Sequence, residues 1–143
     1  MSTESNKAAV RRFRAAFNAG DLDDAFAVFA PDAVRHVAGA PDPLTLEDFA
    51  QFGRAMLSAF SGATSTVEDV IAEGNKVVTR ITFRGTHTGD LMGIPPTGRL
   101  VTVAETIIDQ FADGRIVESW RLFDQMAMMQ QLGVLPAAGQ GGG

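Results

Sequence analysis

The stretch LVTVAETIIDQFADGRIVESWRLF, residues 100–123, is the part of the sequence that decides the fold. It reads as two extended segments, residues 100–111 and 115–123, joined by a short turn. In the first segment, apolar side chains occupy the odd positions Val101, Val103, Ile107 and Phe111. Because side chains alternate between the two faces of a strand, odd positions are expected to face the interior. The stretch therefore predicts a β-hairpin with one buried face.

The register of this hairpin depends on the turn that follows Phe111. We expect a three-residue loop, which pairs Phe111 with Arg115 and so places Glu105 opposite Arg121. The alternative is a two-residue turn at residues 113–114, which would shift the register and move the second strand to the other face. The first register predicts an ion pair between Glu105 and Arg121 on the inward face.

Further strands precede this hairpin. Residues 64–73 and 76–85 are rich in β-branched residues and flank the turn Gly74-Asn75, which predicts a second hairpin. A loop rich in Gly and Pro, residues 86–99, connects the two hairpins. A short helix is expected at residues 125–132, ending at Gly133.

The first half of the chain is predicted to be helical. Val10, Phe13 and Phe17 recur at helical spacing, and charged residues are expected on the other faces of that helix. Those charged residues are Lys7, Arg11, Arg12 and Arg14. A second helix begins after Asp21 and carries the stripe Leu22, Ala25, Phe26 and Phe29, before a short extended segment at residues 33–37. A third begins at Thr45 and carries Phe49, Phe52, Met56 and Phe60.

Composition argues against several classes of function. The chain has 143 residues, no cysteine and a net charge of -5. An acidic chain is poorly suited to nucleic acid, and the apolar runs are too short to span a membrane. Two histidines without ligand spacing argue against a metal site, and no Gly-rich loop opens a helix to bind a dinucleotide. We expect one cytoplasmic domain, residues 1–135, with a disordered tail at residues 136–143.

Six short motifs occur in a familiar order along the chain. They are FNAGD at 17–21, FAPD at 29–32, GTHTG at 85–89, MGIPPTGR at 92–99, DGRIVE at 113–118 and QQLG at 130–133. In this order they resemble the SnoaL-like polyketide cyclases, a family with the fold of nuclear transport factor 2. The resemblance implies an α+β fold, in which a cone-shaped, curved antiparallel sheet and N-terminal helices enclose a pocket. It also implies a cofactor-free ester cyclase of the isomerase or lyase type, commonly a homodimer.

The resemblance breaks at two pocket positions. In the family, an Asp seven residues after the hairpin glycine removes a proton next to a carbonyl, and this chain has Arg121 at that position. The His that accompanies this Asp corresponds here to Ile107. The motifs of the fold are therefore present, while the family's catalytic pair is replaced.

We assign candidate catalytic roles to Glu105, Arg121 and His36. The predicted ion pair either holds a carbonyl-rich substrate or only sets the register of two strands. His36 is either a proton carrier at the pocket mouth or an ordinary, partly buried histidine. Asp109 shares the inward face, but its place near the end of the hairpin predicts exposure to solvent.

Other polar and aromatic residues receive structural roles. His87 is expected to stabilise its loop, and Asp124 to cap the last helix rather than act as a base. Trp120 faces outward in the expected register, as do Ile108, Ile116 and Leu122. An apolar outer face predicts contact with a second copy of the chain.

We expect apolar and small side chains to line a pocket for a hydrophobic small molecule. They are Phe17, Phe29, Phe52, Met56, Phe60, Ile81, Phe83, Met92, Ile107, Ser119 and Phe123. Three functions compete for such a pocket. The first is a base-dependent polyketide cyclase, the second a cyclase that folds a polyene for cycloaddition by shape, and the third a non-catalytic binding protein.

Overall fold

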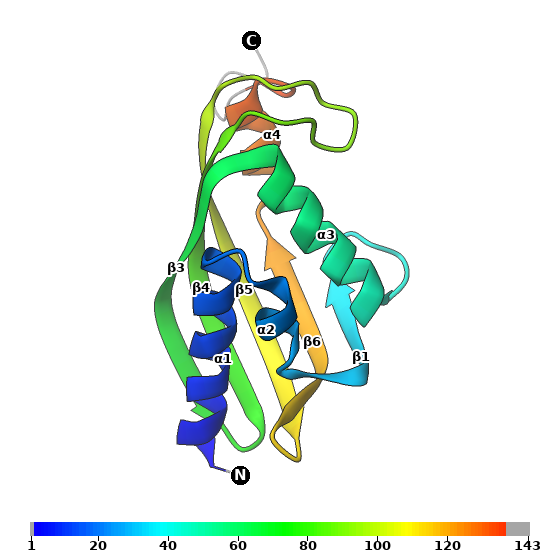
Figure 1. Cartoon of the computed structure of the whole chain (residues 1–143), viewed down its shortest axis with the longest axis vertical. Coiled ribbons are helices and arrows are strands. Elements are labelled where there is room, and N and C mark those ends of the chain that lie inside the picture. The colour runs from blue at the N-terminus through cyan, green and yellow to red at the C-terminus, as the bar shows by residue number, and fades with distance from the viewer. Residues whose placement is uncertain (1, 137–143) are drawn as a thin grey trace.

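The computed structural model describes residues 2–136, which form four helices and six strands (Figure 1). The helices are α1 (Thr3–Asn18), α2 (Leu22–Phe26), α3 (Leu46–Ala59) and α4 (Gln125–Leu132). Each begins after a capping residue whose side chain accepts a hydrogen bond from the backbone N–H three residues on. These caps are Ser2, Asp21, Thr45 and Asp124. The predicted helix starts at Asp21, Thr45 and Asp124 are therefore confirmed.

The strands form one sheet in the order β2-β1-β6-β5-β4-β3. They are β1 (Phe29–Val37), β2 (Leu44–Thr45), β3 (Phe60–Glu73), β4 (Lys76–His87), β5 (Leu100–Ala112) and β6 (Arg115–Phe123). Neighbouring strands are antiparallel except β1 and β6, which are parallel. The sheet is curved, and α1, α2 and α3 lie against one face of it (Figure 1). This arrangement confirms the expected α+β fold.

Two apolar residues belong to strands rather than to the predicted helices. α2 ends at Phe26, and Phe29 is the first residue of β1, where it pairs with Ile116 of β6. Phe60 follows the last residue of α3 and begins β3. Both side chains are buried in the core. The helical spacing was misleading because burial satisfies an apolar residue equally well at the start of a strand.

The hairpin of β5 and β6 has a different turn from the one we expected. Ala112 pairs with Arg115 across a two-residue turn, in which Asp113 and Gly114 both have positive φ, 51° and 80°. This is the backbone of a type I′ turn. The predicted pairing of Phe111 with Arg115 is therefore wrong.

A β-bulge in β6 then restores the orientation of the strand. Phe111 pairs with Ile116, whereas Gln110 pairs with Glu118, so Val117 is the extra residue. One extra residue reverses the alternation of the side chains beyond it. The odd positions of β6 from Ser119 onward therefore face inward, as predicted, although the register differs by two residues from the expected one.

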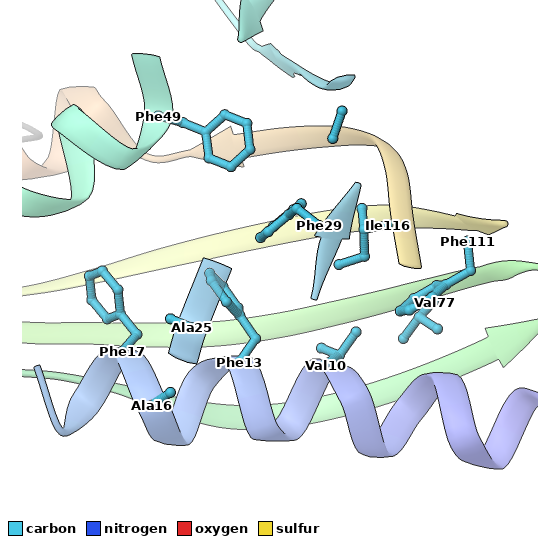
Figure 2. Packing of buried hydrophobic residues seen from close by; sticks show 11 residues of the cluster. Val10, Phe13, Ala16, Phe17, Ala25, Phe29, Phe49, Val77, Phe111 and Ile116 are labelled. Atoms are coloured by element: carbon cyan, nitrogen blue, oxygen red, sulfur yellow. The ribbon is translucent and has the colours of Figure 1, made fainter. Parts of the chain in front are cut away.

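The core nearest the N-terminus lies between α1 and the sheet (Figure 2). Val10, Phe13 and Phe17 point from α1 toward the sheet (Figure 2). Phe49 of α3 lies across the cluster from α1 (Figure 2). Ile116 belongs to this cluster, with 1% of its surface exposed. Its predicted place on the outer face is wrong, because it precedes the bulge at Val117. A second cluster is formed by α3, α4 and the strands β3, β4 and β5, and it includes Met56, Phe60 and Met128.

Two expectations concern the whole chain. Within residues 2–136, no helix is long and apolar enough to cross a membrane. The tail that we expect to be disordered begins at Pro136, and residues 137–143 lie outside the described part of the chain.

Candidate active site

Glu105 and Arg121 meet on the concave face of the sheet, although they are not directly opposite each other. Glu105 on β5 pairs with Phe123, and Arg121 on β6 pairs with Ile107, so the two charged residues are diagonal neighbours. Their side chains form an ion pair between Arg121 Nε and Glu105 Oε2. Only 5% of the Glu105 side chain and 10% of that of Arg121 are exposed. The pair is therefore buried, as the alternation in β5 predicts.

Arg14 joins this pair from α1 and corrects an expectation. We expected its side chain on a different face of the helix from Val10, Phe13 and Phe17. It is buried instead, with Nη2 at 3.7 Å from Glu105 Oε1. Its guanidinium lies 4.6 Å from the centre of the Phe13 ring, and burial lowers the pKa of Arg14. The signal was present in the sequence, because positions 10, 13, 14 and 17 form one helical stripe.

Arg35 is a third buried arginine that the sequence analysis did not identify. It lies on β1, beside Ser119 of β6, and its guanidinium carbon is 4.7 Å from the centre of the Phe49 ring. Burial lowers its pKa to about 10, which leaves it protonated at neutral pH. The alternation Ala33-Arg35, with Ala33 also buried, could have indicated that Arg35 faces inward.

Asp109 is buried, not exposed as we expected. It pairs with Ser119 on β6 and lies under the helices, with 5% of its surface exposed. Burial raises the pKa of the Asp109 carboxyl, and the nearby positive charge of Arg35 offsets part of this effect. The end of the hairpin is covered because α1 lies over the half of the sheet that carries the β5–β6 turn (Figure 1).

Glu105 and the three arginines line a pocket with aromatic walls, whereas Asp109 does not border it. Of the predicted lining residues, Phe17, Phe52, Met56, Phe83 and Phe123 do line it, together with Glu105 and Arg121. Further lining residues that we did not predict are Phe13, Arg14, Phe26, Arg35, Phe49, Gly53 and Ser65. The pocket is narrow, with an interior volume of about 40 Å³.

Six predicted lining residues do not line this pocket. Phe29, Phe60, Ile81, Ile107 and Ser119 are buried in the packed interior instead. Met92 lies in the loop between β4 and β5 and has 63% of its surface exposed. Inward alternation identifies the face of a strand, but it does not tell which inward side chains border free space.

His36 is on the opposite face of the sheet from the pocket. Its Nε2 is 2.7 Å from Glu118 Oε2, and its ring stacks on that of Trp120 at 5.5 Å. The expectation that His36 lies at the pocket mouth is therefore wrong. His36 directly follows Arg35 on β1. Successive side chains of a strand point to opposite faces, so His36 points outward because Arg35 points inward.

The remaining residues have structural surroundings. The buried ring of His87 has its Nδ1 within hydrogen-bonding distance of the Thr97 hydroxyl and of the backbone N–H of the same residue. Asp124 Oδ1 accepts a hydrogen bond of 3.0 Å from the backbone N–H of Ala127, which is the expected helix cap. Trp120 lies beside His36 on the outer face, as predicted.

Comparison with known proteins agrees with this fold. A sequence model of the family described as SnoaL-like polyketide cyclase matches residues 7–132. Aklanonic acid methyl ester cyclase AcmA of Streptomyces galilaeus is 30% identical over 135 residues, which cover 88% of this chain and 89% of AcmA.

Two solved structures extend this comparison. AclR from Streptomyces galilaeus, a proposed hydroxylase, superposes with a TM-score of 0.89 at 30% identity, over 96% of this chain and 86% of AclR. IdmH from Streptomyces antibioticus, a proposed polyketide cyclase, superposes with a TM-score of 0.80 at 34% identity, over 90% of this chain and 98% of IdmH. The family model matches most of the chain, and these relatives agree with it. The chain therefore belongs to the SnoaL-like polyketide cyclase family.

Proposed function

We propose that the protein closes a ring on a hydrophobic, polyketide-like substrate without a cofactor, and that Glu105 is the proton acceptor. The observation that carries this proposal is the position of Glu105 at the base of the aromatic pocket, between two guanidinium groups. Among the described residues that line the pocket, Glu105 is the one carboxylate. It thus takes the chemical part that the resemblance gives to an Asp at the position of Arg121.

The proposed reaction is an intramolecular aldol addition. Glu105 takes the proton from a carbon next to a carbonyl, and the enolate carbon forms a bond to a second carbonyl carbon. The oxygen of that second carbonyl then takes the proton back from Glu105. Arg121 and Arg14 are placed to stabilise the negative charge that develops on oxygen, because charge stabilisation is strong in a site that excludes water.

The narrow pocket sets a condition on this proposal. Sites for drug-sized ligands have volumes of roughly 300 Å³ or more, far above the 40 Å³ of the pocket. A polyketide therefore enters only if aromatic side chains such as Phe52 and Phe17 change their positions. The same aromatic surfaces then hold the chain in a folded pose, which brings the reacting carbons together.

A second candidate function has a specific observation in its favour. Both oxygens of Glu105 are already engaged by Arg121 and Arg14, so Glu105 must give up an ion-pair contact to accept a proton from a substrate. A cyclase that works by shape needs no base. It would fold a polyene in the aromatic pocket and polarise one carbonyl with Arg121.

One substitution separates these two functions. Two first substrates are tried in parallel: aklanonic acid methyl ester, for which the relative AcmA is named, and the matching free acid. We expect Glu105→Gln to lower the rate of cyclisation by roughly 100- to 10,000-fold if Glu105 is the base. Product formation is followed by liquid chromatography and mass spectrometry, with Glu73→Gln, an exposed site, as the control. A Glu105→Gln variant as fast as the Glu73→Gln control would contradict the base and favour the shape-driven cyclase. Binding without any turnover by the wild type would favour a binding protein.

The proposal includes a homodimer in the cytoplasm. Its support is the outer face of the sheet, where Ile108 and Leu122 are exposed beside the stacked rings of His36 and Trp120. An apolar groove follows these residues, and contact with a second copy would remove it from water. The absence of cysteine is in keeping with a reducing compartment.

A further inference from the structure

The charged groups at the base of the pocket do not balance. Three arginines line the pocket, Arg14, Arg35 and Arg121, and all three are largely buried. They face two buried carboxyls, those of Glu105 and Asp109. Positive charge is therefore in excess even when both carboxyls are ionised. Burial raises the pKa of Asp109, so this carboxyl compensates less than an exposed one would.

The charge that acts most strongly on Arg35 is that of Asp109, but the two groups are farther apart than the 4.0 Å of an ion pair. Glu105 is shared between Arg121 and Arg14, which use both of its oxygens. Arg35 forms no ion pair within 4.0 Å with any residue in the range 2–136, and its buried Nε has no hydrogen-bond partner there. The next side chains in the row across the sheet, Ser119 and Asp109, also have buried oxygens without a partner.

An unpartnered guanidinium inside a pocket is costly unless a ligand supplies the missing acceptor. Its planar fork of N–H groups matches the two oxygens of a carboxylate. The ring of Phe49, 4.7 Å from the guanidinium carbon, adds a flat apolar surface beside the charged group. The site thus combines an aromatic wall with a cation, which suits an aromatic or polyene acid.

We propose that Arg35 binds a carboxylate of the substrate, so that the enzyme takes a free acid in preference to the matching neutral amide or ester. The inference rests on the proposed function, because it concerns the same pocket. It sets this chain apart from the relative AcmA, whose name specifies a methyl ester.

The test compares two ligands of equal shape and different charge. 2-Naphthoate and 2-naphthamide are titrated into the full-length wild type at pH 7.5, and binding is measured by calorimetry. We expect 2-naphthoate to bind at least about tenfold more tightly. Arg35→Gln should bring the two affinities within about twofold, whereas Arg80→Gln, an exposed site paired with Asp69, should leave the preference unchanged.

A second variant guards against misfolding of Arg35→Gln. Arg35→Lys keeps the charge but loses the planar fork, so the preference for 2-naphthoate should fall without vanishing. Equal affinities in the wild type, or a preference that survives Arg35→Gln in a folded protein, would overturn the inference. Failure of 2-naphthoate to bind the wild type at millimolar concentration would overturn it as well. None of these results touches the turnover of Glu105→Gln, which decides the proposed function separately.

Discussion

At the scale of single residues, the buried charges depend on one another. Glu105 contacts both Arg121 and Arg14, and Asp109 lies under the influence of Arg35. A buried ion pair adds little net stability, yet removing one partner is expensive because the other charge stays behind without compensation. Substitutions in this group are therefore expected to have effects on stability that are larger than those at the surface.

Arg121→Ala should reduce the free energy of unfolding by about 3 kcal/mol, the lower end of the range for a broken buried pair. The lower end applies because Arg14 still lies 3.7 Å from Glu105. Urea denaturation followed by circular dichroism measures the change. The matched control is Arg80→Ala, whose exposed pair with Asp69 should contribute less than about 1 kcal/mol. An Arg121→Ala variant no less stable than this control would show that the pair is not buried in solution.

Asp109→Asn should become more stable relative to the wild type as the pH rises. The folded protein raises the pKa of Asp109 above its ordinary value of 3.8, so folding favours the protonated form. Stability is therefore lost as the pH increases from about 3.8 through the raised pKa, and asparagine does not pass through this transition. Arg35, Arg14 and Glu105 are the charged groups that act on this carboxyl.

The measurement for Asp109 is a series of urea denaturations between pH 4 and pH 8 on both proteins. The exchange of a neutral carboxyl for an amide adds an offset that does not change with pH, so the slope with pH carries the information rather than the stability at one pH. Parallel profiles would contradict a raised pKa of Asp109. If Asp109→Asn instead became less stable relative to the wild type as the pH rose, the pKa of Asp109 would be lowered in the folded protein.

At the scale of elements, two irregularities in one hairpin determine which side chains reach the pocket. The two-residue turn at Asp113-Gly114 would by itself direct Arg121 away from the helices, and the bulge at Val117 reverses this. Arg121 faces the pocket because the two effects cancel. The short helix α4 then starts directly after β6, at the cap Asp124.

Asp124→Asn should keep nearly all of the stability and activity, because asparagine caps helices as well as aspartate does. Asp124→Ala should lose about 1 kcal/mol, since the backbone N–H of Ala127 then lacks its acceptor. Thermal unfolding and the cyclisation assay test both variants. A thousandfold loss of turnover in folded Asp124→Asn would identify Asp124 as a base rather than a cap.

At the scale of the whole molecule, the sheet separates two surfaces of different character. Its concave face carries the charged pocket, and its outer face carries exposed apolar residues such as Leu122 and Ile108. The resemblance to a family that is commonly dimeric and the apolar groove on that face both favour self-association.

The proposed homodimer predicts a mass of twice the 15.2 kDa of the chain at micromolar concentration, measured by light scattering. Leu122→Glu should yield a monomer, because its side chain is 62% exposed on the proposed interface and the new charge would be buried there. Met92→Glu, 63% exposed in the loop between β4 and β5, serves as the control and should stay dimeric. A monomeric wild type, or a dimer that tolerates Leu122→Glu, would contradict this interface.

The sequence by itself determined the element types, the helix caps and the inward face of β5, which includes Glu105. These features depend on local periodicity and on short-range hydrogen bonds, and both can be read from neighbouring residues. The tertiary structure alone decided the register of β6, because the bulge at Val117 depends on pairing between strands. It also decided the burial of Asp109 and the position of His36 behind the pocket, which follow from how α1 covers the sheet and from how β1 pairs with β6. Arg14 and Arg35 belong to both levels: their positions follow the local pattern, but an arginine is usually exposed, and only the surrounding structure makes these two buried parts of a site.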